Sequence, residues 1–245
     1  MSELTKTLIK RHPLRLALLA LSCLFLQGCL TKSVHLDLRS EENQEEPKVE
    51  GSWSVEFEEK FSDFEVGTEP ENLFILDGAY AVTQEENDKR LTLPGSPVGD
   101  FGLLFGPRVR EKSLSLSFSF LATKKGRRLP ALAAGLGGVR SYRFRLNAAT
   151  KEILLFRHDL EIGKVAYQWE SGAWHSVCFQ AIPGAGENTR IRLKLWKRGE
   201  KEPDEWLLDQ IDPSAFAGGK CALWAYPYSG TPIHFDDLKI ESKAF

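Results

Sequence analysis

Residues 114–120 alternate strictly between apolar and serine side chains. Leu114, Leu116, Phe118 and Phe120 are apolar, and a serine follows each of the first three. Side chains of a β-strand point alternately to opposite faces of a sheet, so this period of two puts every apolar side chain on one face. A helix does not produce that period. The segment therefore predicts a half-buried strand of an antiparallel sheet.

The same alternation recurs in residues 141–146 and 190–195. Turn signals such as Pro94-Gly95 and Gly137-Gly138 separate the strand candidates at spacings of about eight to twelve residues. A series of about 11 or 12 short strands without helical periodicity is typical of two sheets packed face to face. We expect an all-β fold, an antiparallel β-sandwich with jelly-roll strand order.

The N-terminal segment has the pattern of an export signal. Four basic residues precede an apolar run at 16–26: Lys6, Lys10, Arg11 and Arg15. The run is shorter than the ~20 residues that a membrane-spanning helix needs. It ends in Leu26-Gln27-Gly28-Cys29, which resembles the lipobox of bacterial lipoproteins, where the cysteine receives a diacylglycerol group. A plain secretory signal and an uncleaved anchor are the alternatives.

The lipobox resemblance implies a chain in three parts. Residues 1–28 are the signal peptide, residues 29–51 are the lipidated Cys29 with an acidic flexible tether, and residues 52–245 are the β-sandwich domain. Acyl chains such as palmitate are expected to hold the protein at a membrane of the cell envelope. Leu30 stands where an aspartate is associated with inner-membrane retention, so the outer membrane is favoured if the host has two membranes.

Composition and motifs exclude several classes of function. The formal net charge of −2 gives no overall attraction to nucleic acid. The sequence contains no phosphate-binding glycine loop and no zinc-type histidine spacing. A retaining glycosidase needs two carboxylates about 5 Å apart, and the acid-rich segments at 56–59, 69–71 and 204–205 are better explained as solvated charge. We therefore name no catalytic residue.

Three segments in this order resemble the concanavalin A-like lectin/glucanase superfamily, including laminin-G-like and 3-keto-disaccharide-hydrolase-like domains. They are Phe61 to Glu65, Gly172 to Val177, and Phe235 to Leu238. The resemblance spans residues 53 to 242 and implies a jelly-roll sandwich. The superfamily includes lectins, hydrolases and adhesive modules, so the fold alone does not choose among them.

Two features could stabilise such a sandwich. Glu65 and Asp236, with Asp237 as the alternate, match by residue type a structural calcium site that jelly-roll carbohydrate-binding modules build from both chain ends. Alternatively, these acids cap strand ends in water. Cys178 and Cys221 are either joined in a disulfide, as an oxidising compartment would favour, or are two separate buried thiols.

Aromatic and basic residues are the candidates for ligand binding. Trp224, Tyr226 and Tyr228 alternate into a turn and could stack on sugar rings. Arg143 and Arg145 lie on the polar face of their predicted strand. If that strand neighbours residues 190–194, Arg190, Arg192 and Lys194 would join them in a basic patch for an anionic glycan. A solvated sheet face balanced by nearby glutamates is the alternative.

The leading hypothesis is a surface-tethered, non-enzymatic binding or adhesion module that recognises a carbohydrate or an envelope protein. The first rival is a glycoside-cleaving hydrolase of the 3-keto-disaccharide-hydrolase type, which the early and late motifs would serve equally well. The second rival is a purely structural envelope lipoprotein without a small ligand.

Overall fold

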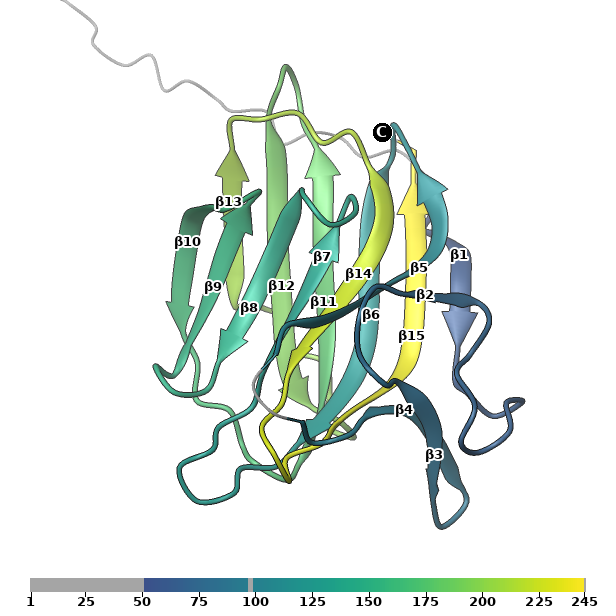
Figure 1. Ribbon diagram of the computed structural model, residues 1–245. Coiled ribbons are helices and arrows are strands. Elements are labelled where there is room, and N and C mark those ends of the chain that lie inside the picture. Colours follow the sequence, from purple (N-terminus) through teal and green to yellow (C-terminus); the bar gives the residue numbers. More distant parts are fainter. Residues whose placement is uncertain (1–50, 97–98, 245) are drawn as a thin grey trace, which may run out of the picture. The chain divides into compact units, whose positions relative to one another are not determined.

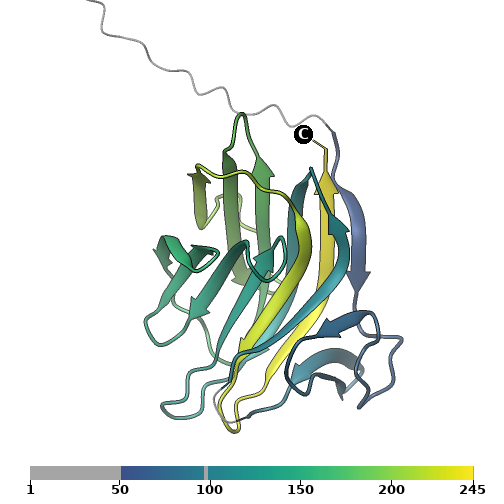
Figure 2. The ribbon, with the colours of Figure 1, turned by 45° about the horizontal axis from the view of Figure 1, so that its top comes forward.

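The structure is a computed structural model that describes residues 51–96 and 99–244, and all its named strands belong to two sheets. Figure 1 shows the strands and Figure 2 the same ribbon from a second direction. Sheet A has the order β13-β12-β11-β6-β15-β4-β3, with β1 also paired to β15. Its strands are β1 (Ser54–Glu59), β3 (Ala81–Glu85), β4 (Asp88–Leu93), β6 (Ser113–Ala122), β11 (Trp174–Pro183), β12 (Thr189–Lys197), β13 (Leu208–Asp212) and β15 (Ile233–Lys243).

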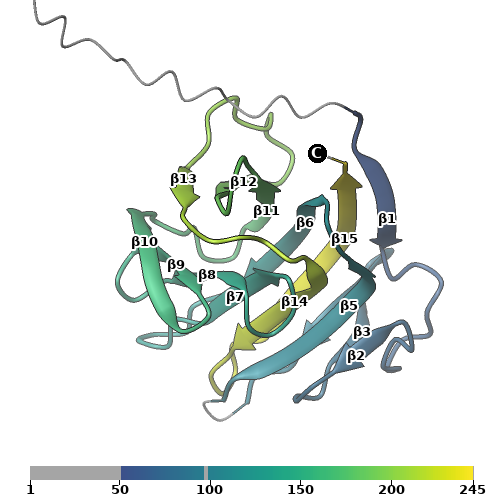
Figure 3. The ribbon, with the colours of Figure 1, turned by 90° about the horizontal axis from the view of Figure 1, so that it is seen from above.

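Sheet B has the order β10-β9-β8-β7-β14-β5-β2. Its strands are β2 (Leu73–Ile75), β5 (Phe101–Val109), β7 (Ala131–Leu136), β8 (Tyr142–Asn147), β9 (Glu152–Arg157), β10 (Leu160–Ala166) and β14 (Gly219–Tyr226). The strand pairs of both sheets are antiparallel. Seen from above in Figure 3, the sheets form two layers. The predicted antiparallel sandwich is confirmed.

The segments with a period of two form β6, β8 and β12. The described part of the chain contains 15 strands, more than the sequence predicted. The additional strands are short, as in β2 with three residues, and a period cannot be read from so few positions. Residues 51–96 and 99–244 form no helix, and so none that is long and apolar enough to cross a membrane.

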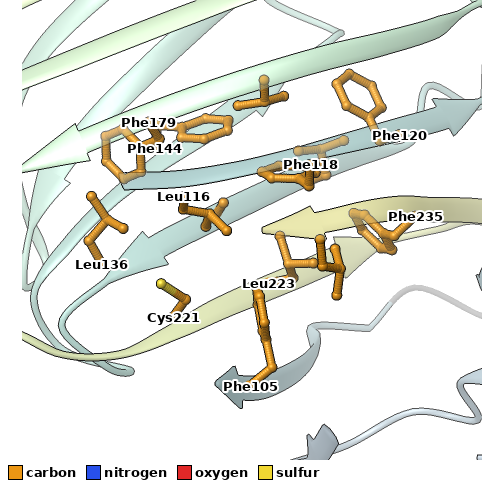
Figure 4. Packing of buried hydrophobic residues seen from close by; sticks show 14 of the residues in the cluster. Phe105, Leu116, Phe118, Phe120, Leu136, Phe144, Phe179, Cys221, Leu223 and Phe235 are labelled. Carbon is orange, nitrogen blue, oxygen red and sulfur yellow. The ribbon is translucent and has the colours of Figure 1, made fainter. Parts of the chain in front are cut away.

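Aromatic side chains fill the space between the sheets (Figure 4). Phe144 of sheet B meets Phe179 of sheet A edge to face, with ring centroids 5.1 Å apart, and both side chains are fully buried. In sheet A, Phe118 packs on Phe235 at 6.1 Å. Truncating a buried phenylalanine to alanine costs about 3–5 kcal/mol, so these rings contribute much of the stability of the sandwich.

A polar contact joins the sheets at the edge that carries β13. The Tyr142 hydroxyl of β8 and the Arg157 guanidinium of β9 both donate to Asp212 Oδ2 of β13, each at 2.7 Å. Burial, together with the Asp212 carboxylate, raises the pKa of Tyr142 to about 12. The hydroxyl therefore remains a donor at neutral pH, and the contact fixes this edge of sheet B on sheet A.

The two cysteines are not joined, which corrects the expected disulfide. Both thiols are free and buried. Cys221 lies in the core between the sheets, as Figure 4 shows. Cys178 lies between the core residues Val177 and Phe179 of β11, so its side chain points to the outer face of sheet A, where Ser115 Oγ is 3.8 Å from its sulfur. Cys178 is therefore on the outer side of sheet A, whereas Cys221 points from β14 of sheet B into the core on the inner side of sheet A.

Thiol titration tests this arrangement. Burial raises the pKa of both thiols, so neither should react with a thiol reagent while a chain of residues 51–245 is folded. Unfolding that chain without reductant should expose both thiols. The number of reactive thiols in the unfolded chain should be the same with and without prior reduction. If no thiol reacts before reduction, the two cysteines form a disulfide.

The half-buried side chain of His234 predicts how the stability of the domain depends on pH. Its Nδ1 lies 2.7 Å from Thr92 Oγ1, and burial, reinforced by Arg90, lowers its pKa from 6.5 to about 4. The native state holds this ring neutral, so its contribution is complete above about pH 6.5 and is lost as the pH falls toward about 4. The free energy of unfolding, measured with urea, should decrease across that window.

His234→Gln should flatten this pH dependence, because glutamine does not titrate. His175 leaves a residual slope, since burial also lowers its pKa. His158→Asn is the matched control at an exposed turn with a positive φ, which asparagine tolerates. An unchanged slope in the His234 variant would refute the assignment.

Candidate functional site: an arginine-aromatic cluster on sheet B

The outward side of sheet B carries a group of five side chains that we call the arginine-aromatic cluster: Arg143, Arg145, Phe156, Trp224 and Tyr226. The strand register assembles it. Trp224 pairs with Ala133 of β7, and Ala133 pairs with Arg145 of β8. Arg143 in turn pairs with Phe156 of β9. The outward side chains of β14, β8 and β9 therefore come together across β7, whose outward side chains are small.

Small residues make the floor of the cluster. A Cβ atom at Gly102 of β5 would come within 2.8 Å of the Trp224 ring, and one at Gly135 of β7 within 2.9 Å. The indole thus lies flat across the neighbouring strands and packs with Ala133, Ala222 and Leu104. Glycine at these two positions leaves the room for a ring to lie along the sheet instead of standing on it.

The arginines cover the rings. The guanidinium carbon of Arg143 lies 5.3 Å from the Trp224 centroid and 5.5 Å from the Phe156 centroid, and that of Arg145 lies 4.3 Å from the Tyr226 centroid. Trp224 is only 5% exposed. This corrects the expectation of a bare tryptophan platform, because the groups presented to solvent above the indole are guanidinium groups held by cation-π contacts.

Neither arginine has an acidic partner among the described residues. The Nε atoms of Arg143 and Arg145 are buried and make no hydrogen bond. The carboxylate of Asp100 is near Tyr226, whose pKa rises to about 12, first because of burial and then because of Asp100. Arg143 and Arg145 lower that pKa. Two cations without an ion pair, near the single carboxylate of Asp100, give this face a local positive charge.

The outer face of sheet A shows the opposite pattern. Its cations are paired with acids at short distances, as in Lys194 with Glu202 at 2.8 Å and Arg198 with Asp237 at 2.9 Å. Arg192 also lies over a tryptophan ring, that of Trp206, but its guanidinium is within 3.3 Å of the Asp209 carboxylate. The unpaired arginines of sheet B are therefore a property of one face and not of the whole surface.

A pocket of about 630 Å³ lies beside the cluster at the end of β5 and the start of β14. Leu104 both lines this pocket and packs against the floor of the cluster, so the two are continuous. Four basic residues and one acid line it: Arg108, Arg110, Arg140, Lys220 and Glu111. The Lys220 ammonium donates to the Gly106 carbonyl. We call this hollow the basic pocket.

The structure brings together four of the five predicted ligand-binding residues: Arg143, Arg145, Trp224 and Tyr226. Tyr228 lies apart in the β14–β15 turn, where its backbone N–H donates to Thr231 Oγ1 at 2.7 Å. The proposed union with Arg190, Arg192 and Lys194 is wrong, because β12 belongs to sheet A and β8 to sheet B. Sequence reasoning missed Phe156 and the basic pocket. The pocket is formed by the ends of β5 and β14 together with loop residues that show no period.

The predicted calcium ligands do not fit a calcium site. Asp236 is 2% exposed and its carboxylate forms an ion pair with Arg198 at 3.0 Å. The guanidinium group already balances the negative charge that a calcium ion would need. Burial and the neighbouring Asp237 raise its pKa. Glu65 is exposed in the β1–β2 connection. Within residues 51–96 and 99–244, no three His, Cys, Asp or Glu side chains are placed to hold a metal ion.

The acidic segments considered for catalysis have structural contacts. Glu56 accepts from Lys112 and from Ser242, which lower its pKa. Glu59 accepts from the backbone N–H of Phe61 and from the Asn72 amide, both at 2.6 Å. Asp204 pairs with Lys201 at 3.0 Å on the surface. These contacts give Glu56, Glu59 and Asp204 a structural role.

Comparison with known proteins gives the fold. No family model and no curated sequence matches the chain. A point mutant of the Emp46p carbohydrate recognition domain superposes with a TM-score of 0.55 and 11% identity, covering 77% of this chain and 97% of that one. The fold is a concanavalin A-like β-sandwich. Lectin II from Ulex europaeus has a TM-score of 0.51 and 12% identity over 78% of this chain and 100% of that one.

A third similar structure is the exoplasmic/lumenal domain of VIP36 in its Ca²⁺/Man3GlcNAc-bound form. It has a TM-score of 0.53 and 7% identity, covering 71% of this chain and 84% of that one. At these identities the three likenesses establish the sandwich alone, and the function must be argued from the residues of this chain.

Gly135→Ala tests the floor of the cluster. The new Cβ would lie 2.9 Å from the Trp224 ring. The β7 backbone is hydrogen-bonded to strands on both sides and cannot move away to relieve this contact. We expect a loss of about 1–3 kcal/mol in the free energy of unfolding, as for overpacked cores, together with a shift in tryptophan fluorescence. Gly184→Ala is the control, because its nearest neighbour would be 3.6 Å away. Equal stability of the two variants would contradict the flat placement of the indole.

Proposed function

We propose that residues 52–245 form a carbohydrate-binding module and that the ligand lies on the arginine-aromatic cluster. The observation that carries the proposal is the pair of guanidinium groups, each stacked on an aromatic ring and neither paired with an acid. The lectin-type sandwich and the carbohydrate recognition domains among the similar structures support it.

The chemistry of the cluster suits a sugar. A guanidinium group offers N–H donors in a fixed plane, and sugar hydroxyl, carboxylate or sulfate oxygens are acceptors. Stacking on Trp224 and Tyr226 orients those donors before any ligand arrives. The half-buried Tyr226 hydroxyl stays protonated at neutral pH, because its pKa is raised to about 12. Its proton is directed to the Asp100 carboxylate, so the hydroxyl oxygen can accept a hydrogen bond from a sugar hydroxyl.

A glycan array probed with the full-length protein tests this function. We expect at least one glycan to bind, and Arg143→Ala to weaken that binding by about tenfold or more, equivalent to ~1.4 kcal/mol. Arg192→Ala is the matched control, since Arg192 also lies over a tryptophan but on sheet A and beside Asp209. Absence of binding to every glycan, or equal weakening by the control, would refute the proposal.

We also propose that the module is tethered to a cell-envelope membrane by lipid on Cys29. Residues 1–50 lie outside the described part of the chain, so the support is the lipobox resemblance and the acidic composition of the segment that follows it. In a bacterial host with two membranes, Leu30 favours the outer one.

The tether is tested by the mass of the mature N-terminus. The expected product begins at Cys29 and carries a diacylglycerol group, and Cys29→Ala abolishes the added mass and the membrane association. A mature chain that begins elsewhere without lipid would overturn the tether and leave the carbohydrate site unaffected.

A further inference from the structure

We infer that the ligand is an acidic polysaccharide that runs along the outer face of sheet B from the arginine-aromatic cluster into the basic pocket. The inference rests on the proposed function and adds the class of glycan. It depends on three observations: the unpaired arginines, the continuity of the cluster with the pocket, and the contrast with the paired cations of sheet A.

The first step is the unmet charge at the cluster. The Nε atoms of Arg143 and Arg145 are buried without a hydrogen bond, as is Nε of Arg192 on sheet A. The difference is the neighbouring acid: Arg192 lies beside Asp209, whereas Arg143 and Arg145 form no ion pair with the described residues. A guanidinium edge matches the planar geometry of a carboxylate and binds it through two N–H groups. A neutral sugar would satisfy some donors with hydroxyls but would leave the charge of both arginines uncompensated.

The second step is the extension of this charge along one direction. Outward positions of β14 run from Tyr226 past Trp224 and Ala222 to Lys220, which lines the basic pocket. At ~3.4 Å per residue, these six steps span about 20 Å. Arg108, Arg110 and Arg140 of the pocket have no ion pair within residues 51–96 and 99–244. An extended chain with repeated negative groups fits this row better than a single compact sugar.

The third step is the location of the charge. The net charge of the chain is −2, so the protein as a whole does not attract polyanions. On sheet A, the acids Asp209, Glu202 and Asp237 lie within 3.3 Å of their basic partners. Lys164 at the edge of sheet B is likewise paired with Glu152 at 3.7 Å. A polyanion is therefore directed to the part of sheet B that carries Arg143 and Arg145, which have no ion pair among the described residues.

The experiment compares acidic glycans with their neutral counterparts. The full-length protein is tested on the array glycans that carry carboxylate or sulfate groups and on the same glycans after carboxyl reduction or desulfation, with polygalacturonate and dextran sulfate as polymer probes. We expect at least tenfold stronger binding to the acidic form of one or both classes, and a loss of affinity as NaCl rises, because salt screens such contacts. The carboxylate and sulfate arms identify which acid group is recognised.

Two sets of variants locate the contacts. Arg143→Gln with Arg145→Gln should remove the preference for the acidic form. Arg108→Gln, Arg110→Gln and Arg140→Gln together should weaken binding of the long polymer by about tenfold but spare short oligomers that reach only the cluster. Arg192→Gln on sheet A is the control, and unchanged thermal unfolding of each variant shows that it has folded.

Each other outcome rejects the inference. Equal binding of acidic and neutral forms, with dependence on Arg143 retained, would overturn the acidic ligand and leave the carbohydrate module standing. Equal binding of single-stranded DNA and dextran sulfate would indicate an unselective charged surface. Absence of binding to every glycan would remove the proposed function and this inference with it.

Discussion

The whole domain depends on two sheets that hide one face each. Because successive side chains of a strand point in opposite directions, a row such as Leu116, Phe118 and Phe120 goes inward only if the residues between go outward. The edge-to-face contact of Phe144 with Phe179 shows how closely the two inward rows meet. The same rule sends Arg143 and Arg145 to the outside of β8, on either side of the inward Phe144. The core and the arginine-aromatic cluster are thus two consequences of one alternation.

The basic side chains on the outward faces of the two sheets are held by different contacts. Sheet A neutralises its cations with acids from neighbouring strands and loops, as Asp209 of β13 does for Arg192 of β12. Sheet B instead rests its arginines on aromatic rings, which hold a cation without cancelling its charge. This difference is the reason for proposing that sheet B, and not sheet A, binds an anion.

Much of the fold could be predicted from the sequence, because period two identifies β6, β8 and β12 and assigns a face to each residue. The alternation of inward and outward positions would also have argued against the disulfide. Cys178 lies between the inward Val177 and Phe179 and so points outward, whereas Cys221 points inward like Leu223. Which strands become neighbours could not be predicted, since β8 and β14 come together only through β7, far from β14 in the chain. The stacking of Arg143 on Trp224 depends on that neighbourhood and on Gly102 and Gly135 below the ring.

Holding an arginine between two rings has a consequence for the thermodynamics of recognition. A free arginine side chain loses rotamer entropy when a partner fixes it, at a cost of about 0.5–1.5 kcal/mol. Arg143 lies over both Trp224 and Phe156 and has already lost much of that freedom during folding. A preorganised surface of this kind leaves a larger share of the contact energy as affinity, so even a flexible partner can be retained by a few residues.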